Sequence, residues 1–254
     1  MKTTIYCFSA TGNSLTTARK IAENLENCQI VSAISARRQT KVIEDAEAVG
    51  FVFPVYYGDM PCIVRELISK MVFRADTYIF SVVTCRGHAG ACNQRMDQLL
   101  KTRGQKLSFA AAVKMPGNSF INAPEVDAAH LAAQNDAVCN VTKRIAAREV
   151  EDYFDATLLP LAQTAYPNNF RGIIAENKCT GCGLCTKLCP MDNIAIIDNR
   201  AYIGDNCATC LACFHWCPVE AIWMSKQENI ARRAKYHHPE ISVNDILAQK
   251  GNNR

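Results

Sequence analysis

The sequence predicts an α/β domain with a doubly wound parallel sheet, joined to a small α+β module that is rich in cysteine. Three observations support this fold class. As far as residue 114, short apolar runs alternate with segments of helical periodicity. A polar loop that contains glycine directly follows the first apolar run, and two similar cysteine runs lie between residues 179 and 217.

Apolar runs rich in β-branched and aromatic residues indicate the strands, and apolar residues recurring every three or four positions indicate the helices. Short connections between alternating elements favour a parallel sheet covered by helices on both faces. The expected strands are Thr3–Phe8, Gln29–Ile34, Ala48–Pro54, Thr77–Thr84 and Leu107–Lys114. The expected helices are Ser14–Glu26, Cys62–Met71, Ala91–Lys101 and a long one from about Glu125 to Leu159, with Pro124 in its first turn.

The segment Tyr166–Phe170 has turn composition and no clear periodicity, so we expect the domain boundary there. The first domain would cover residues 1–165, including an extra helical segment at 115–165. We interpret that segment as packing for the two modules, and a substrate lid is the less favoured alternative. The cysteine-rich module would cover 171–226. A polar, basic tail at 227–254 would either bind phosphate or an acidic partner, or lie as a solvated strap over the modules.

Composition excludes several classes of protein. The 254 residues are about half apolar, and the formal charge of +4 is too small to indicate a nucleic-acid partner. No apolar stretch approaches the ~18 residues that a membrane span needs. No secretory signal is visible, and a chain with many free thiols belongs in a reducing compartment. We therefore expect a cytoplasmic protein with no membrane span; the oligomeric state is not predicted.

Two copies of the pattern C-x-x-C-x-x-C-x-x-x-C-P lie near the end of the chain, and the second follows the first by 28 residues. Eight thiolates at this spacing suit two 4Fe–4S cubanes, each of which moves one electron at a time. Structural zinc is the alternative, but triplets of cysteine closed by Cys-Pro do not fit isolated four-ligand zinc sites. The eight candidate ligands are Cys179, Cys182, Cys185, Cys189, Cys207, Cys210, Cys213 and Cys217.

The loop Ser9-Ala-Thr-Gly-Asn-Ser14 follows the first strand and opens the first helix. Hydroxyls, backbone N–H groups and the helix N-terminus together form a cradle for an anion. The loop contains no lysine, so it is not the phosphate loop of nucleoside triphosphatases. It suits a single phosphate held by neutral donors, and a capped helix start without a ligand is the alternative. Its candidate binding residues are Ser9, Thr11, Gly12, Asn13 and Ser14.

This loop closely resembles the flavodoxin loop that grips the phosphate of FMN. The resemblance covers residues 1 to about 114 and implies that FMN is the cofactor. In flavodoxins the loops after the third and fourth strands sandwich the isoalloxazine ring, with an aromatic residue often stacked on one face. The corresponding candidates here are Pro54, Tyr56, Tyr57 and Gly58 in the first loop, and Thr84, Cys85, Arg86, Gly87 and Gly90 in the second.

Arg86 and His88 depart from the smaller or acidic residues expected in a flavodoxin. A cation near the ring would favour reduced, anionic flavin, although His88 is as readily explained as a solvated loop residue. Outside the two runs, six cysteines are scattered along the chain, and we expect them to be buried, unreactive thiols. Cys85 is the exception to test, because it lies in an expected flavin loop, although the structural interpretation is favoured there too.

Residues 171–226 resemble bacterial two-cluster ferredoxins, and the whole chain resembles the flavodoxin–ferredoxin fusion proteins of anaerobic bacteria and archaea. The ferredoxin resemblance implies crossed ligation, in which the first three cysteines of each run and the fourth of the other hold one cluster. One cluster would take Cys179, Cys182, Cys185 and Cys217. The other would take Cys207, Cys210, Cys213 and Cys189.

Three functions follow from this organisation. The first is an electron-transfer protein that relays electrons between FMN, two 4Fe–4S clusters and a redox partner protein. The second is an FMN-dependent oxidoreductase that reduces a small-molecule acceptor, such as a quinone or nitro compound, fed through the clusters. No acid–base pair or substrate loop stands out to favour that enzyme, and no catalytic residue is predicted. The third is a redox sensor, for which the common DNA-binding patterns are absent from the sequence.

Overall fold

The computed structural model describes residues 1–119, 123–151, 172–224 and 234–251. They form two compact units. The first contains Met1–Ser9, Asn13–Gly117 and the described residues from Pro124 to 151. The second contains Ala10–Gly12, the described residues of 118–123 and those from 172 onward. The predicted boundary segment 166–170 lies outside the described residues. None of the described helices is both long and apolar enough to cross a membrane.

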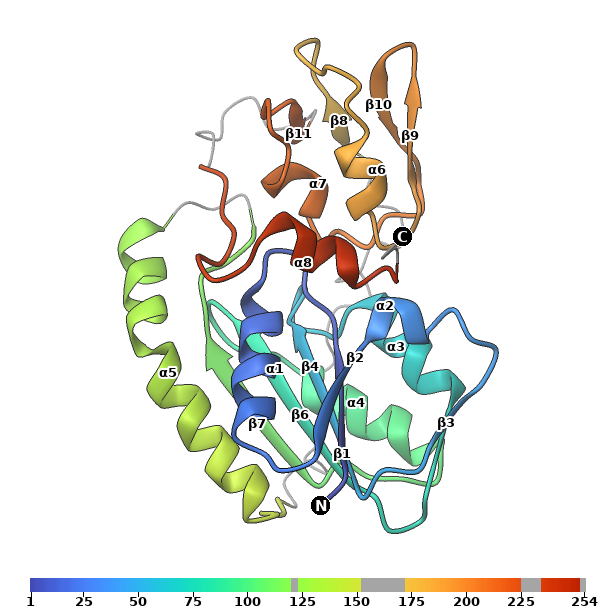
Figure 1. The fold of residues 1–254 in the computed structure, drawn as a ribbon, viewed down its shortest axis with the longest axis vertical. Coiled ribbons are helices and arrows are strands. Elements are labelled where there is room, and N and C mark those ends of the chain that lie inside the picture. The colour runs from blue at the N-terminus through green and yellow to red at the C-terminus, as the bar shows by residue number, and fades with distance from the viewer. Residues whose placement is uncertain (120–122, 152–171, 225–233, 252–254) are drawn as a thin grey trace. The chain divides into compact units, whose positions relative to one another are not determined.

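Five parallel strands form the sheet of the first unit, in the order β2-β1-β4-β6-β7 (Figure 1). The winding direction changes beside β1, since β2 pairs with one edge of it and β4 with the other. This order confirms the predicted doubly wound sheet, and it is that of flavodoxin-like folds. The strands are β1 (Thr3–Cys7), β2 (Cys28–Ser32), β4 (Ala48–Pro54), β6 (Tyr78–Cys85) and β7 (Phe109–Lys114).

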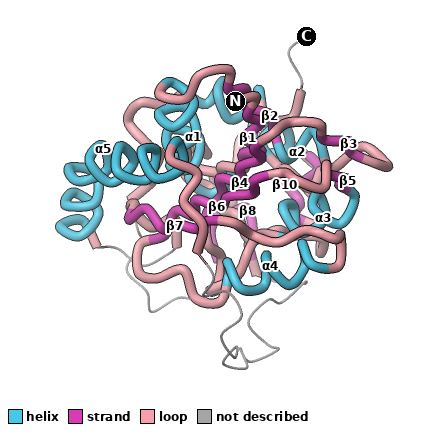
Figure 2. The backbone as a smooth tube through the Cα atoms, turned by 90° about the horizontal axis from the view of Figure 1, so that it is seen from below, coloured by secondary structure: helices cyan, strands magenta, loops and turns pink. Residues whose placement is uncertain are grey.

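Helices cover both faces of this sheet (Figure 2). α1 (Asn13–Glu23) and α5 (Pro124–Ala146) lie on one face, and α3 (Cys62–Lys70) and α4 (Cys92–Lys101) lie on the other. The strands are buried between these layers, and all eight residues of β6 are buried. Burial on both faces explains why the central strands read as continuous apolar runs rather than as alternating patterns.

Three short elements depart from the predicted pattern. The expected strand 29–34 ends early, because Ser32 caps a one-turn helix, α2 (Ala33–Ala36), with its side chain accepting from Ser35 N at 3.3 Å. The sequence analysis also missed a parallel pair of three-residue strands, β3 (Val42–Glu44) and β5 (Met71–Phe73). Runs this short give no usable periodicity.

α5 ends at Ala146, before the residue 159 that periodicity predicts. Arg148 has a φ of 53° and its N–H bonds to Ile145 O, while Glu149 N bonds to Arg144 O. This is the Schellman arrangement, which satisfies the last carbonyls of a helix and turns the chain away. The usual sequence signal for it is glycine, and the left-handed position here holds arginine. The rest of the predicted helix, from 152 to 159, lies outside the described residues.

The second unit contains two antiparallel strand pairs and three short helices. β8 (Ile173–Ala175) pairs with β11 (Ile222–Met224), which joins the two ends of the cysteine-rich module. β9 (Ile194–Ile197) and β10 (Arg200–Ile203) form a hairpin whose two turn residues have positive φ, as a type I′ turn requires. The helices are α6 (Leu184–Leu188), α7 (Ala212–His215) and α8 (Val243–Ala248). α8 was not predicted in the tail, although Ser242 and Asp245 form its capping box.

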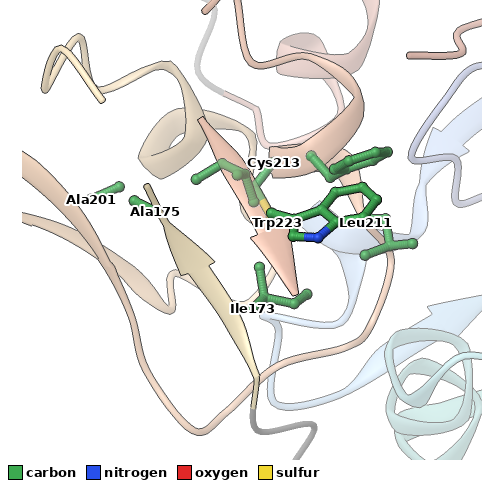
Figure 3. Packing of buried hydrophobic residues seen from close by; sticks show 8 residues of the cluster. Ile173, Ala175, Ala201, Leu211, Cys213 and Trp223 are labelled. Carbon is green, nitrogen blue, oxygen red and sulfur yellow. The ribbon is translucent and has the colours of Figure 1, made fainter. Parts of the chain in front are cut away.

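A compact hydrophobic cluster fills the cysteine-rich module (Figure 3). Trp223 and Phe214 pack together with ring centroids 5.6 Å apart, and Leu211 lies beside them. Partly buried cysteines pack against this cluster: Cys179, Cys185, Cys207 and Cys217. The cysteine side chains therefore lie against apolar neighbours, an environment that limits the access of solvent.

Candidate functional site

The polar loop between β1 and α1 contains three buried residues that belong to the first unit: Ser9, Asn13 and Ser14. Asn13 Nδ2 donates to Pro116 O at 2.8 Å, and Ser14 Oγ lies 2.8 Å from Thr84 Oγ1. These bonds tie the loop to the C-terminal ends of β6 and β7. Because α1 begins at Asn13, the N–H groups of its first turn lack partners inside the helix. The arrangement suits an anion such as a phosphate.

The middle of the same loop belongs to the second unit. Ala10 O accepts a hydrogen bond from Trp216 Nε1 at 2.9 Å, and Thr11 O accepts one from His238 N at 2.7 Å. Gly12 has a φ of 104°, and a Cβ there would lie 2.9 Å from His238 Cβ. Glycine is therefore required at this position both by the backbone conformation and by the packing of the tail.

The loops after β4 and β6 meet at two glycines of the first unit. A Cβ on Gly90 would lie 2.5 Å from Gly58 Cα, so the two backbones touch. Tyr56 is buried with its ring edge-on to Phe8, the centroids being 6.3 Å apart. Tyr57 is 53% exposed and has a φ of 53°. Of the two tyrosines, Tyr57 is the more exposed, as stacking on a bound ring requires.

Arg86 is paired within the first unit. Its Nε and Nη2 each donate to a carboxylate oxygen of Asp127 at 2.9 Å, and Gly117 N donates to Asp127 Oδ1 at 3.1 Å. The carboxylate therefore balances the cation that the sequence analysis placed near the ring. His88 is exposed, and its Nδ1 accepts from Gly90 N at 3.1 Å, which shapes the loop.

The remaining candidate residues of these loops are Pro54, Thr84, Cys85 and Gly87. Pro54 and Thr84 are partners in the β4–β6 ladder, and Cys85 O accepts from Met115 N at 3.0 Å. Burial raises the pKa of the Cys85 thiol, so that it stays protonated at neutral pH, which agrees with the structural interpretation of this cysteine. A Cβ on Gly87 would meet nothing within 4 Å, so this residue borders open space.

The scattered cysteines differ in exposure. Cys7 and Cys92 are buried, and burial raises the pKa of the Cys7 thiol to about 12. The prediction that all six are buried is wrong for Cys139, which is exposed on α5. Cys28 and Cys62 are partly buried. The expectation rested on the usual burial of free cysteines, whereas Cys139 lies on a solvent-exposed side of the long helix.

Four cysteines from both runs line one cavity of the second unit: Cys179, Cys182, Cys185 and Cys217. The pKa of Cys185 is raised to about 11, mainly by burial and in second place by the neighbouring thiols. Thiols that lie this close together raise one another's pKa when no metal is bound, and a metal or cluster binds them as thiolates by displacing the protons.

The other four cysteines form a second group. Cys210 and Cys213 are buried, and burial raises the pKa of both thiols. Cys189 and Cys207 lie close enough to both of them to add to this effect. The fold therefore brings the last cysteine of each run next to the first three of the other run.

Backbone N–H groups point at the cysteine sulfurs in a pattern that repeats. Asn193 N donates to Cys189 Sγ at 3.4 Å, and 28 residues later Ala221 N donates to Cys217 Sγ at 3.2 Å. Donors of this kind stabilise thiolate charge and tune iron–sulfur clusters. Two further bonds run from Ala201 N to Cys179 Sγ, at 3.5 Å, and from Thr209 N to Cys207 Sγ, at 3.3 Å.

The donor set fits a cubane rather than a single ion. Within the described part of the chain, no three cysteine, histidine or acidic side chains converge on a position for one metal ion. A cubane takes each thiolate at a different iron, so its four ligands stand farther apart than those of a tetrahedral zinc. The thiol groups, their sulfur-directed N–H donors and their apolar surroundings all suit two such clusters.

Sequence reasoning missed several residues that contact these sites. Asp127 lies in the first turn of α5, where an acidic residue usually only stabilises the helix dipole, so the sequence did not mark it as a site residue. Trp216 lies inside the second cysteine run and His238 in the tail, and nothing in their spacing linked them to the first loop. Lys235, whose Nζ lies 3.4 Å from the ring centroid of Phe214, also comes from the tail.

Two family models match the chain. One, described as a flavodoxin domain, matches residues 4–123, and the other, described as a 4Fe-4S dicluster domain, matches residues 171–218. No curated protein matches the chain.

Several solved structures match over part of the chain. A flavodoxin from Streptococcus pneumoniae TIGR4 matches at 14% identity over 58% of this chain and 99% of that chain, with a TM-score of 0.40. An FMN-dependent NADH-azoreductase from Bacillus anthracis, in complex with FMN, matches at 9% identity over 56% and 100%, with a TM-score of 0.37. Rubredoxin oxygen:oxidoreductase from the anaerobe Desulfovibrio gigas matches at 14% identity over 57% and 37%, with a TM-score of 0.31.

Proposed function

Since the chain joins a flavodoxin domain to a 4Fe–4S dicluster domain, we propose that it relays electrons between a redox partner protein and FMN through two 4Fe–4S clusters. The observation that carries this proposal is the grouping of eight cysteines into two sets of four, each with sulfur-directed N–H donors. A protein with a single cluster or a single structural zinc would have no use for both sets.

The two ligand sets cross between the runs. Cys217 completes the set begun by the first run, and Cys189 completes the set begun by the second. Crossing makes the two clusters part of one folded unit, because neither run can hold a cluster alone. The cavity that Cys217 shares with the first three cysteines supports this assignment.

FMN is held by the loop Ser9–Ser14 at its phosphate and by the loops after β4 and β6 at its ring. Buried hydroxyl and amide groups at Ser9, Asn13 and Ser14 supply neutral donors to the phosphate. Tyr57 would stack on the ring, and the touching glycines Gly58 and Gly90 would set how closely the two loops approach it. When bound, FMN takes up one or two electrons and each cubane takes one, so the chain interconverts paired and single electrons.

Cofactor analysis of anaerobically purified protein tests this proposal. We expect about one FMN, eight irons and eight sulfides per chain, as the ligand count requires. Stoichiometric zinc with little iron would contradict the cluster assignment. Rate assays then separate a relay from a reductase: a relay passes electrons to many acceptors without preference, whereas a reductase saturates with one class of small molecule.

A further inference from the structure

Asp59 is a buried carboxylate in the loop after β4, and two arginines converge on it. Its Oδ2 accepts from Arg65 Nη2 on α3 and from Arg95 Nη1 on α4, each at 2.7 Å. Its Oδ1 accepts from Met60 N at 2.7 Å. Asp59 is only 2% exposed, whereas the arginine side chains are 45% and 29% exposed. The two cations therefore lie between a buried anion and the protein surface.

Asp59 also closes the tight turn that contains Tyr57. The backbones of Tyr56 and Asp59 exchange two hydrogen bonds, of 2.9 and 3.0 Å, around two residues with positive φ. Gly58 O at the tip of this turn accepts from Ala91 N at 3.0 Å, just before α4 begins. Arg65 and Arg95 thus tie the loop after β4 to α3 and α4, and the bond between Ala91 N and Gly58 O links that loop to the loop after β6. We call Asp59, Arg65 and Arg95 the clamp.

The charges of the clamp do not balance. Two guanidinium cations face one carboxylate, although a single arginine would neutralise it. The other charged pair of this region, Arg86 with Asp127, is balanced. Positive charge is therefore in excess at the point where the two loops meet.

We propose that the clamp positions the two ring-binding loops and that its excess positive charge favours reduced over oxidised FMN. The inference rests on the proposed function, which puts the ring at these loops. Reduction adds electrons to the ring, and a nearby cation stabilises the added negative charge. The clamp residues act through charge and loop geometry, and they are positioning residues rather than catalytic ones.

Opposite charge changes at the clamp provide the test. Arg95→Gln removes a cation, and we expect it to lower the ratio of reduced to oxidised FMN affinity about tenfold, a fall of about 30 mV in the two-electron potential. Asp59→Asn keeps the shape of the side chain and removes the anion, so the potential should rise. The readout is the midpoint potential of bound FMN in an anaerobic spectroelectrochemical titration at fixed pH, together with the Kd for oxidised FMN.

The sign of the shift separates charge from structure. If the clamp only held the loops, both substitutions would loosen them and move the potential in the same direction, which would overturn the inference. Arg95→Lys retains the charge and should restore most of the potential lost in Arg95→Gln, even if Asp59→Asn fails to fold. Arg74→Gln, which removes an exposed cation before β6, is the matched control and should leave the potential unchanged.

The proposed function and this inference fail in different ways. Wild-type protein that binds no FMN would overturn both. Protein that binds FMN normally, but shows equal potentials in wild type, Arg95→Gln and Asp59→Asn, would overturn the inference alone.

Discussion

At the scale of single residues, the candidate FMN loops depend on buried polar side chains that already have partners in the protein. Asn13 bonds to a backbone carbonyl, and Ser14 bonds to the hydroxyl of Thr84. Removing one partner of such a pair leaves the other unsatisfied, at a cost of about 1–3 kcal/mol. A variant that tests ligand binding must therefore be compared with one that only disturbs the same element.

Thr11→Val tests the phosphate loop, because it removes a hydroxyl and keeps the side-chain shape. Losing one charge-assisted hydrogen bond costs about 1.5–3 kcal/mol, so the Kd for FMN should rise about 10- to 100-fold with both clusters intact. Titration calorimetry of flavin-free protein measures this change. Thr17→Val is the matched control, since Thr17 Oγ1 donates only to Asn13 O within α1. An unchanged Kd in Thr11→Val would mean that the phosphate binds elsewhere.

Asp127→Asn tests the pairing of Arg86. The asparagine retains one acceptor but loses the charge that balances the partly buried guanidinium, so the free energy of unfolding should fall by about 2 kcal/mol. Urea denaturation of the protein measures this. Asp76→Asn, which breaks the exposed pair with Arg74, should cause no measurable change. Equal stability of the two variants would show that the Arg86 pair is as weak as a surface one.

At the scale of elements, the cysteine-rich module repeats its backbone as well as its cysteines. Gly181 and Gly183 have φ of 65° and 76°, and the residues 28 positions later, Thr209 and Leu211, have φ of 54° and 59°. The left-handed conformation is unfavourable for threonine and leucine. The second half therefore adopts the geometry of the first against its own local preference, which indicates that the loop shape is required at the cysteines.

Paired cysteine substitutions test crossed ligation. Cys189→Ala with Cys210→Ala should leave one intact cubane by EPR spectroscopy, because both changes strike the same cluster. Cys189→Ala with Cys182→Ala should leave none, because they strike different clusters. The reverse pattern would show that each run holds its own cluster, and the electron path would then have to be redrawn.

At the scale of the whole molecule, the chain is a flavin and iron–sulfur redox protein made of two domains with different cofactors. The cysteine-rich module supplies all eight candidate cluster ligands, whereas most of the candidate FMN residues lie in the first unit. Loss of one cofactor should therefore leave the other bound, and the relay is testable by its rates rather than by binding.

Loss of either cluster should slow the reduction of FMN by a low-potential, ferredoxin-type donor at least about tenfold, a barrier increase of about 1.4 kcal/mol. Cys182→Ala and Cys210→Ala each remove one cluster, and stopped-flow absorbance follows the flavin. Dithionite reduces FMN directly, so its rate should change little. Cys139→Ala, at an exposed position outside the cysteine runs, is the control. If both routes slow equally in the cluster variants, the damage lies in folding and the relay loses its support.

The sequence by itself determined the elements whose signal is local. Continuous apolar runs predicted the central strands, because a strand that is buried on both faces is apolar at nearly every position. Cysteine spacing predicted the kind of metal group, because ligand chemistry depends on residue type and local loop length. The polar loop after β1 was predicted for the same reason, since a strand, a short loop and a helix start are adjacent in the chain.

Only the tertiary structure decided which distant residues meet. Arg86 pairs with Asp127, Arg65 and Arg95 converge on Asp59, and His238 reaches the backbone of Thr11. The structure also shows that α5 ends before a left-handed arginine, Arg148, and that Cys139 is exposed to solvent. The ion pairs and the contact of His238 join residues far apart in the chain, and such contacts follow from packing and not from any periodicity of the sequence.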